Sequence, residues 1–145
     1  MTKITFVENY QIQEKQVQEQ TANEATERAM ALLASTFLHA ATVTHFMHLK
    51  TRSFSQHQAL GSFYTELPGK IDKIVESYQG KYGLLSNYAE TYYNLDLDPV
   101  SYLENLKDTL AALRISIPQD SEIQNEVDEI SSLINTTLYK LRFLL

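Results

Sequence analysis

Glycine and proline are scarce in this chain, and their scarcity constrains the fold more than any other feature of the sequence. The 145 residues include 4 glycines and 3 prolines. Few stretches alternate polar and apolar residues with the period of two that a half-buried strand requires. Long segments instead carry apolar residues three and four positions apart, which is typical of amphipathic helices. The sequence therefore predicts an all-α protein.

The periodicity indicates four helices, of which the first covers about residues 23–50. The second begins near Ser55 and ends at Gly80. Within it, Pro68 lacks the backbone N–H for one helical hydrogen bond, so we expect a kink and not a break. Apolar residues on more than one face of this helix predict a two-fold dimer through the first two helices. These residues are Leu60, Phe63, Tyr64, Leu67, Ile71, Ile74 and Val75.

The third helix opens at Asp98, an N-cap residue followed by Pro99 in the first turn, and it ends before Pro118. The fourth begins near Ser121 and runs towards the C-terminus. Two Ser-x-x-Gln pairs predict capping boxes at the starts of the second and fourth helices. The pairs are Ser55 with Gln58, and Ser121 with Gln124.

A tyrosine-rich segment, KYGLLSNYAETYYNLDLD, separates the second helix from the third. It is too long for a tight turn between antiparallel neighbours. We expect it to cross the length of the bundle, with a short helix of its own around residues 87–92. A single long crossover in the middle of four helices is the ferritin-like topology. The predicted fold is a ferritin-like four-helix bundle over residues 23–145. Residues 1–22 are polar and Gln-rich, and form either an arm or a helical extension.

Composition narrows the functions that such a bundle can have. Hydrophobic residues make up 43% and charged residues 21% of the chain, as in ordinary soluble proteins. No apolar run approaches the ~18 residues that cross a bilayer, and no signal sequence is evident, so we expect a cytoplasmic protein. The formal charge of -6 argues against DNA binding. Because cysteine is absent, imidazole and carboxylate groups must hold any transition metal.

Candidate metal ligands gather between residues 44 and 77, where His45, His48, His57, Asp72 and Glu76 occur. Asp72 and Glu76 are four residues apart and share one helical face. His57 precedes Asp72 by about four turns, so the two cannot hold one metal ion within a single subunit. They can meet only if a second copy packs antiparallel to the first. The alternative is that Asp72 and Glu76 form a solvated face with Lys70 and Lys73, through ion pairs within the helix.

This stretch resembles Dps-type miniferritins, in which a histidine ends the first helix, another starts the second, and Asp-x-x-x-Glu follows. The resemblance implies iron, or another divalent metal, at a ferroxidase-like site between subunits of a dimer or larger shell. Spacing favours His45 as the first ligand, whereas the local context favours His48. Several features depart from the family: Leu49 replaces a tryptophan, and Pro68-Gly69 interrupts the helix. The N-terminal residues lack the lysine cluster with which many Dps proteins hold DNA.

The chain also resembles small phage-encoded ferritin-like proteins of unassigned function. The matching patterns are HxxTxSxxxHxALGxFY from His48 to Tyr64, YQGKYG from Tyr78 to Gly83, and TLYKLRFL from Thr137 to Leu144. This resemblance implies a viral source and a host-cell location. Two functions follow as alternatives: a Dps-like iron-binding oligomer, and a metal-free interaction protein that docks on a host or phage partner.

Overall fold

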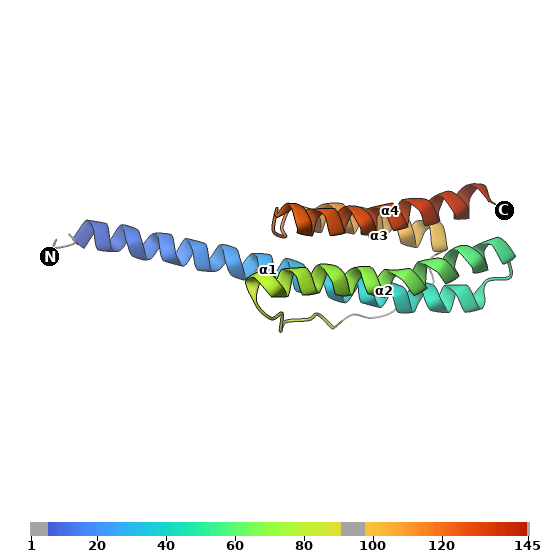
Figure 1. Cartoon of the computed structure of the whole chain (residues 1–145), viewed down its shortest axis with the longest axis horizontal. Coiled ribbons are helices and arrows are strands. Elements are labelled where there is room, and N and C mark those ends of the chain that lie inside the picture. Colours follow the sequence, from blue (N-terminus) through green and yellow to red (C-terminus); the bar gives the residue numbers. More distant parts are fainter. Residues whose placement is uncertain (1–5, 91–97, 145) are drawn as a thin grey trace.

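The computed structural model describes residues 6–90 and 98–144, and within these ranges it contains helices and no strand. The helices are α1 (Phe6–Lys50), α2 (Phe54–Tyr82), α3 (Pro99–Arg114) and α4 (Ser121–Phe143). The prediction of an all-α, four-helix chain is therefore confirmed (Figure 1).

The four helices form a bundle in which every neighbour is antiparallel. Helix α2 packs against α1 and α4, and α3 packs against α4 and α1. Figure 1 shows α1 and α4 running in one direction along the bundle, and α2 and α3 running in the other. Because α2 and α3 point the same way, the end of α2 and the start of α3 lie at opposite ends of the bundle.

The bundle core is made by one apolar stripe from each helix. Helix α2 contributes five side chains with no exposed surface: Leu60, Phe63, Leu67, Ile71 and Ile74. They pack in one cluster with residues of the other three helices. With Tyr64 and Val75, these five were expected to be more apolar residues than one bundle core requires. The chain buries the five in its own core, and the dimer through the first two helices stays a prediction.

The start of α2 differs from the predicted capping box. Its N-cap is Ser53, whose hydroxyl accepts a hydrogen bond from the backbone N–H of Gln56. Ser55, the predicted cap, instead lies in the first turn with its hydroxyl 2.9 Å from that of Ser53. Further along, α2 continues through Pro68 without a break and ends at Tyr82, two residues beyond the predicted Gly80.

The starts of α3 and α4 contrast in how their backbone N–H groups are satisfied. The Asp98 carboxylate accepts from the N–H groups of Val100 and Ser101, so the predicted N-cap is confirmed. The N-cap of α4 is Asp120, and it makes no side-chain capping bond. The predicted box from Ser121 to Gln124 is wrong, because the Gln124 amide donates to the Pro118 carbonyl instead.

The connection after α2 leaves the helix at Gly83, whose φ of 101° lies in the left-handed region that favours glycine. The next described residues are not helical, so the predicted short helix is wrong for residues 87–90; residues 91 and 92 lie outside the described residues. Leu85 is buried in the core, and its N–H donates to the Gln79 side chain. The Ala89 N–H donates to the Ser35 hydroxyl, so the connection passes alongside α1.

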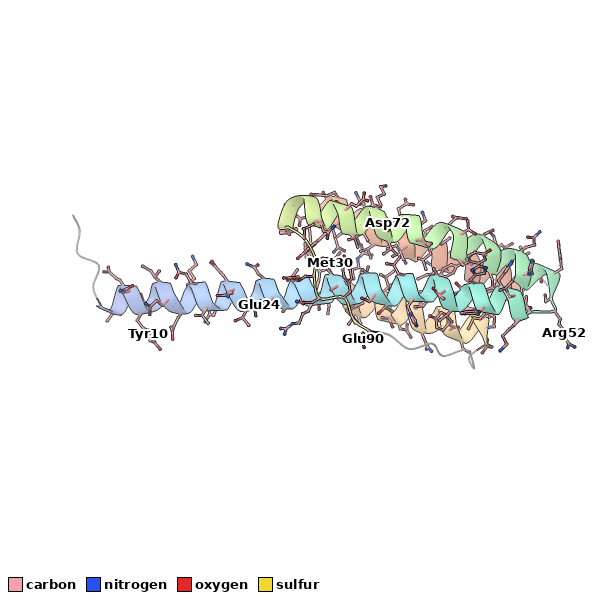
Figure 2. The ribbon with its side chains drawn as sticks, turned by 90° about the horizontal axis from the view of Figure 1, so that it is seen from below. Tyr10, Glu24, Met30, Arg52, Asp72 and Glu90 are labelled. Carbon is pink, nitrogen blue, oxygen red and sulfur yellow. The ribbon has the colours of Figure 1, made fainter. Side chains whose placement is uncertain are left out.

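Helix α1 begins at Phe6, well before the predicted start at residue 23. Residues 7–25 are exposed throughout, and the first buried residue of α1 is Ala29. Figure 2 shows Tyr10 and Glu24 on a part of α1 that extends beyond the other helices, with Met30 where the bundle begins. At 1.5 Å per residue, this extension is about 28 Å long. We call residues 7–25 the arm.

Part of α1 is apolar and long enough to cross a bilayer, by length and composition alone. This window, whose mean hydropathy is 1.3, differs from the expectation that no apolar run approaches the length needed to cross a bilayer. In the structure 56% of the window is buried inside the bundle, as expected for the core helix of a bundle.

Candidate functional site

Three histidines meet at the end of the bundle where α1 turns into α2. The last turns of α1 carry His45 and His48, and the first turn of α2 carries His57. The turn between the helices is short, because α1 ends at Lys50 and Ser53 already caps α2. The close approach of the two helix ends therefore follows directly from the local sequence.

His48 and His57 form two reciprocal hydrogen bonds, each between the ring of one residue and the backbone carbonyl of the other. The Nδ1 atom of His48 lies 2.7 Å from the backbone carbonyl oxygen of His57. The Nδ1 atom of His57 lies 3.0 Å from the carbonyl oxygen of His48. The two rings stack with centroids 3.6 Å apart. Because a carbonyl can only accept, each Nδ1 must carry a proton, and when the ring is neutral its lone pair is on Nε2.

Gly61 allows the His48 ring to lie against α2. A Cβ atom at position 61 would be 3.2 Å from both Cε1 and Nδ1 of His48. That distance is closer than an ordinary van der Waals contact, so a larger residue would push the ring away from the His57 carbonyl. Gly61 is therefore part of the contact that joins α1 to α2.

His45 lies on the outer side of the same group and is exposed. Its ring stacks on that of Tyr64, with centroids 3.9 Å apart and planes tilted by 9°. Tyr64 also meets the edge of His48 at 5.2 Å. His45, His48, His57, Gly61 and Tyr64 together form what we call the histidine cluster. Sequence reasoning named the three histidines, but it did not find Gly61.

The two predicted carboxylate ligands lie elsewhere on α2. Asp72 and Glu76 are exposed, and Asp72 is about 22 Å further along the helix than His57. Figure 2 shows Asp72 well away from Arg52, which lies in the turn between α1 and α2. Among the described residues, no three side chains of the types that bind metals are grouped closely enough to hold an ion. Within one chain, the structure does not bring the carboxylates to the histidines.

The charged face of α2 is organised differently from the solvated face that was expected. Lys70 pairs with Glu129 at 3.2 Å and Lys73 with Glu126 at 3.0 Å, so both lysines reach α4. Pairs within α2 were expected instead. Neither Asp72 nor Glu76 has an ion pair or side-chain hydrogen bond to another described residue. Both carboxylates are therefore free to meet a ligand or a second molecule.

A second polar cluster joins the end of α2 to the start of α4, and the sequence contained no pattern that predicts it. The Asp120 carboxylate accepts from the Lys81 ammonium and from the Tyr82 hydroxyl. These hydrogen bonds lower the pKa of Asp120 and raise the pKa values of Lys81 and Tyr82. Asp120 makes these two hydrogen bonds and no capping bond to α4, so the cluster joins the end of α2 to the start of α4.

The helices and their packing define the chain as an all-α protein built on a four-helix bundle. It belongs to the family of unknown function DUF5856, whose model matches residues 48–141. The match begins at His48 and extends into α4, so it includes the His48–His57 pair, whereas the arm precedes it.

The chain is also similar to a protein of Enterobacteria phage T4, described as an uncharacterized 14.6 kDa protein in the mobD-ri intergenic region. The two are 27% identical over 100 residues, which cover 67% of this chain and 75% of the phage protein. No solved structure matches the chain.

Proposed function

We propose that this chain is a phage-type interaction protein, built on a ferritin-like bundle, that works by binding another protein and not by catalysis. Two features support the ferritin-like assignment: the four pairs of packed helices are all antiparallel, and a long connection, residues 83–98, separates α2 from α3. The phage relative supports a viral source and a location in the cytoplasm of the host cell. Since one bundle can serve unrelated functions, the function has to be argued from particular surfaces.

The observation that carries this proposal is the arm. It is helical and exposed throughout residues 7–25, and its side chains Val7, Tyr10 and Val17 are exposed by 62%, 55% and 63%. A single helix of this length is only marginally stable in water without packing. Its apolar side chains therefore gain most if another protein covers them, and we expect a partner encoded by the host or by the phage.

The test is a pull-down with full-length protein and with a variant that lacks residues 1–21. Recovery of one stoichiometric partner by the full-length chain, and its loss with the shortened chain, supports the proposal. Equal recovery by both chains would assign binding to the bundle instead of the arm. If neither chain recovers a stoichiometric partner, which includes a second copy of itself, the interaction function is wrong.

Metal binding is a second candidate, and one feature of the histidine cluster favours it. Metal-binding histidines commonly donate their other ring N–H to a backbone carbonyl, as both His48 and His57 do. This fixes the tautomer and leaves each Nε2 lone pair available. In this hypothesis iron, or another divalent metal, is held by His57 with His48 or His45, and by Asp72 and Glu76 of a second copy. The chemistry would be ferroxidase-like oxidation of Fe(II), with oxygen or peroxide as the electron acceptor.

The two carboxylates provide a clean test of this candidate. Asp72 and Glu76 are exposed and unpaired among the described residues, so Asp72→Asn with Glu76→Gln should leave the fold intact. Retained iron and iron oxidation in the wild type, with loss of both in the double variant, would support an intersubunit site. Wild-type protein that is purified without chelator and neither retains nor oxidises iron would rule it out.

A further inference from the structure

We propose that a groove between α2 and α4 binds a short acidic peptide segment of another protein through one bulky apolar side chain. The groove lies at the end of the bundle opposite the arm (Figure 1). It is separate from the arm, so the inference goes beyond the proposed function and does not depend on it. Three features of the groove carry it: its shape, the groups that line it, and the charges around it.

The groove has the size and length to seat one side chain of an extended segment. Its volume is about 300 Å³, at the lower end of the range of about 300–1,000 Å³ for pockets that hold small molecules. Helix α2 lines it from Phe54 to Ser62, over a length of roughly 12 Å. An extended peptide covers this length with about four residues. Ala59 is buried in the same lining, where a larger side chain would fill the space.

Two apolar side chains in the lining remain exposed to solvent. Phe54 on α2 is 77% exposed, and Leu144 at the end of α4 is 47% exposed. A bulky apolar side chain that enters the groove removes its own surface from water together with part of theirs. An aromatic side chain gains most, because it buries a large area and loses little conformational freedom. We therefore expect an aromatic anchor on the partner.

The polar groups in the lining favour a peptide over a lipid surface. Ser55, Gln58 and Ser62 line the groove beside the two apolar residues. A hydroxyl or amide that is covered by a lipid chain loses its hydrogen bonds to water and gains none. The N–H and C=O groups of a peptide backbone can replace those bonds. The formal charge of -6 also disfavours a bilayer, because peripheral membrane binding uses clusters of several cations.

Two cations beside the groove favour carboxylates on the partner. Lys140 is in the lining, and Arg52 lies two residues before Phe54 in the turn that leads into α2. Neither forms an ion pair with another residue in the described part of the chain. Carboxylates on either side of the aromatic anchor can pair with these cations. Such pairs at an exposed rim contribute selectivity more than affinity.

The chain has few carboxylates of its own around this end of the bundle. The sequence contains no Asp or Glu from residue 28 to residue 65, and none after Glu129. Glu66, the next carboxylate along α2, lies one turn beyond the end of the groove. At the start of α3, Asp98 caps the helix and Glu104 is engaged in an ion pair. Although the whole chain is acidic, the groove therefore lies in a positively charged surface.

The test is a nuclear magnetic resonance titration of the full-length protein with three peptides that are acetylated and amidated. Their sequences are Glu-Glu-Phe-Glu-Glu, Glu-Glu-Ala-Glu-Glu and Lys-Lys-Phe-Lys-Lys. We expect the first peptide to shift the amide signals of Ser55, Ala59, Ser62 and Lys140 saturably, with a Kd on the order of 10⁻⁴ M because little surface is buried. The other two peptides should bind at least ~10-fold more weakly. Binding this weak is lost in the washes of a pull-down, so it does not interfere with the test of the arm.

Two matched pairs of variants locate the binding site. Ser62→Trp fills the groove, whereas Ser132→Trp adds the same side chain to α4 outside the groove. Lys140→Glu reverses a charge in the lining, whereas Lys107→Glu makes the same change on α3. All four positions are exposed, so we expect the variants to fold, and circular dichroism checks this. Ser62→Trp and Lys140→Glu should weaken binding of the first peptide by at least ~10-fold, and the two controls should leave it within about 2-fold.

Several results would overturn the proposal. They are the absence of saturable binding, equal binding of the acidic and basic peptides, and unchanged binding by Ser62→Trp. If the protein alone shows the same shifts as its concentration rises, a second copy occupies the groove and the peptide partner is wrong. If the peptide does not bind but vesicles of phosphatidylcholine and phosphatidylserine bind the wild type and not Lys140→Glu, the surface meets a membrane instead. A chain without residues 1–21 should bind the peptide as the full-length chain does, so failure of the arm proposal leaves this result unchanged.

Discussion

Substitution of Gly61 by alanine tests whether the His48 ring is held firmly between the two helices. In the interior of an exposed helix, glycine to alanine stabilises by about 1 kcal/mol. At position 61 the new Cβ would lie 3.2 Å from Cε1 and Nδ1 of His48. The ring cannot move aside freely, because its Nδ1 is bonded to the His57 carbonyl and its face is stacked on His57.

The expected magnitude follows from these two opposing effects. A neutral hydrogen bond contributes about 0.5–1.5 kcal/mol net, and a stacked ring pair contributes a similar amount. If displacement of His48 weakens both, the loss of about 1–3 kcal/mol exceeds the helical gain of about 1 kcal/mol. We therefore expect Gly61→Ala to lower the free energy of unfolding by about 1 kcal/mol.

The same helix supplies matched controls. A Cβ at Gly69 or at Gly80 would meet nothing within 4 Å. We therefore expect Gly69→Ala and Gly80→Ala to stabilise the protein by about 0.5–1 kcal/mol each. In a His48→Ala background the steric conflict disappears, so Gly61→Ala should then stabilise by a similar amount.

The assay is urea denaturation followed by far-ultraviolet circular dichroism, with the four chains of the double-mutant cycle measured together. A coupling free energy of about 1–2 kcal/mol between positions 48 and 61 is expected. If Gly61→Ala stabilises as much as Gly69→Ala, or if the coupling free energy is zero, then the contacts with His57 do not hold the His48 ring in place.

Other predictions concern the core and the Asp120 cluster. Leu67 has no exposed surface, so Leu67→Ala should lower the free energy of unfolding by about 2–5 kcal/mol, whereas Leu38→Ala, at a side chain that is 40% exposed, should cost much less. The folded-state pKa of Asp120 is lowered by Lys81 and Tyr82, so its contribution to stability is present above the unfolded value of about 3.9. That contribution is lost as the pH falls through the folded pKa. Asp120→Asn should therefore weaken the acid dependence of the unfolding midpoint; an unchanged dependence would show that these bonds add no stability.

Much of the fold could be predicted because its signals are local. The Asp98-Pro99 pair identified the start of α3, and apolar spacing identified all four helices. The predicted helix starts were wrong where two local patterns were equivalent, or where residues distant in sequence contact the capping residue. Ser53-x-x-Gln56 and Ser55-x-x-Gln58 are the same pattern, and Ser53 caps the helix. At α4, Lys81 and Tyr82 contact Asp120, which makes no capping bond.

The sequence could not decide whether the N-terminal residues form an arm or a helical extension, because they are polar on most of the helix circumference. Apolar periodicity identifies helices that pack, and the arm has little to pack against within its own chain. The structure makes it the first part of α1.

The candidate site was predictable only in its residue types. The sequence drew attention to His45, His48 and His57, but the reciprocal bonds depend on how closely two helix ends approach across a turn. The sequence also could not show the contribution of Gly61. This residue acts by having no side chain, which leaves room for the His48 ring.

The most direct test of the central claim compares the full-length chain with a chain that lacks residues 1–21, at equal concentrations. The account places partner binding in the arm, so the full-length chain should capture one stoichiometric partner from host lysate and the shortened chain should capture none. Both chains should unfold at the same urea concentration, because the arm contributes nothing to the core. Equal capture by the two chains would contradict the account.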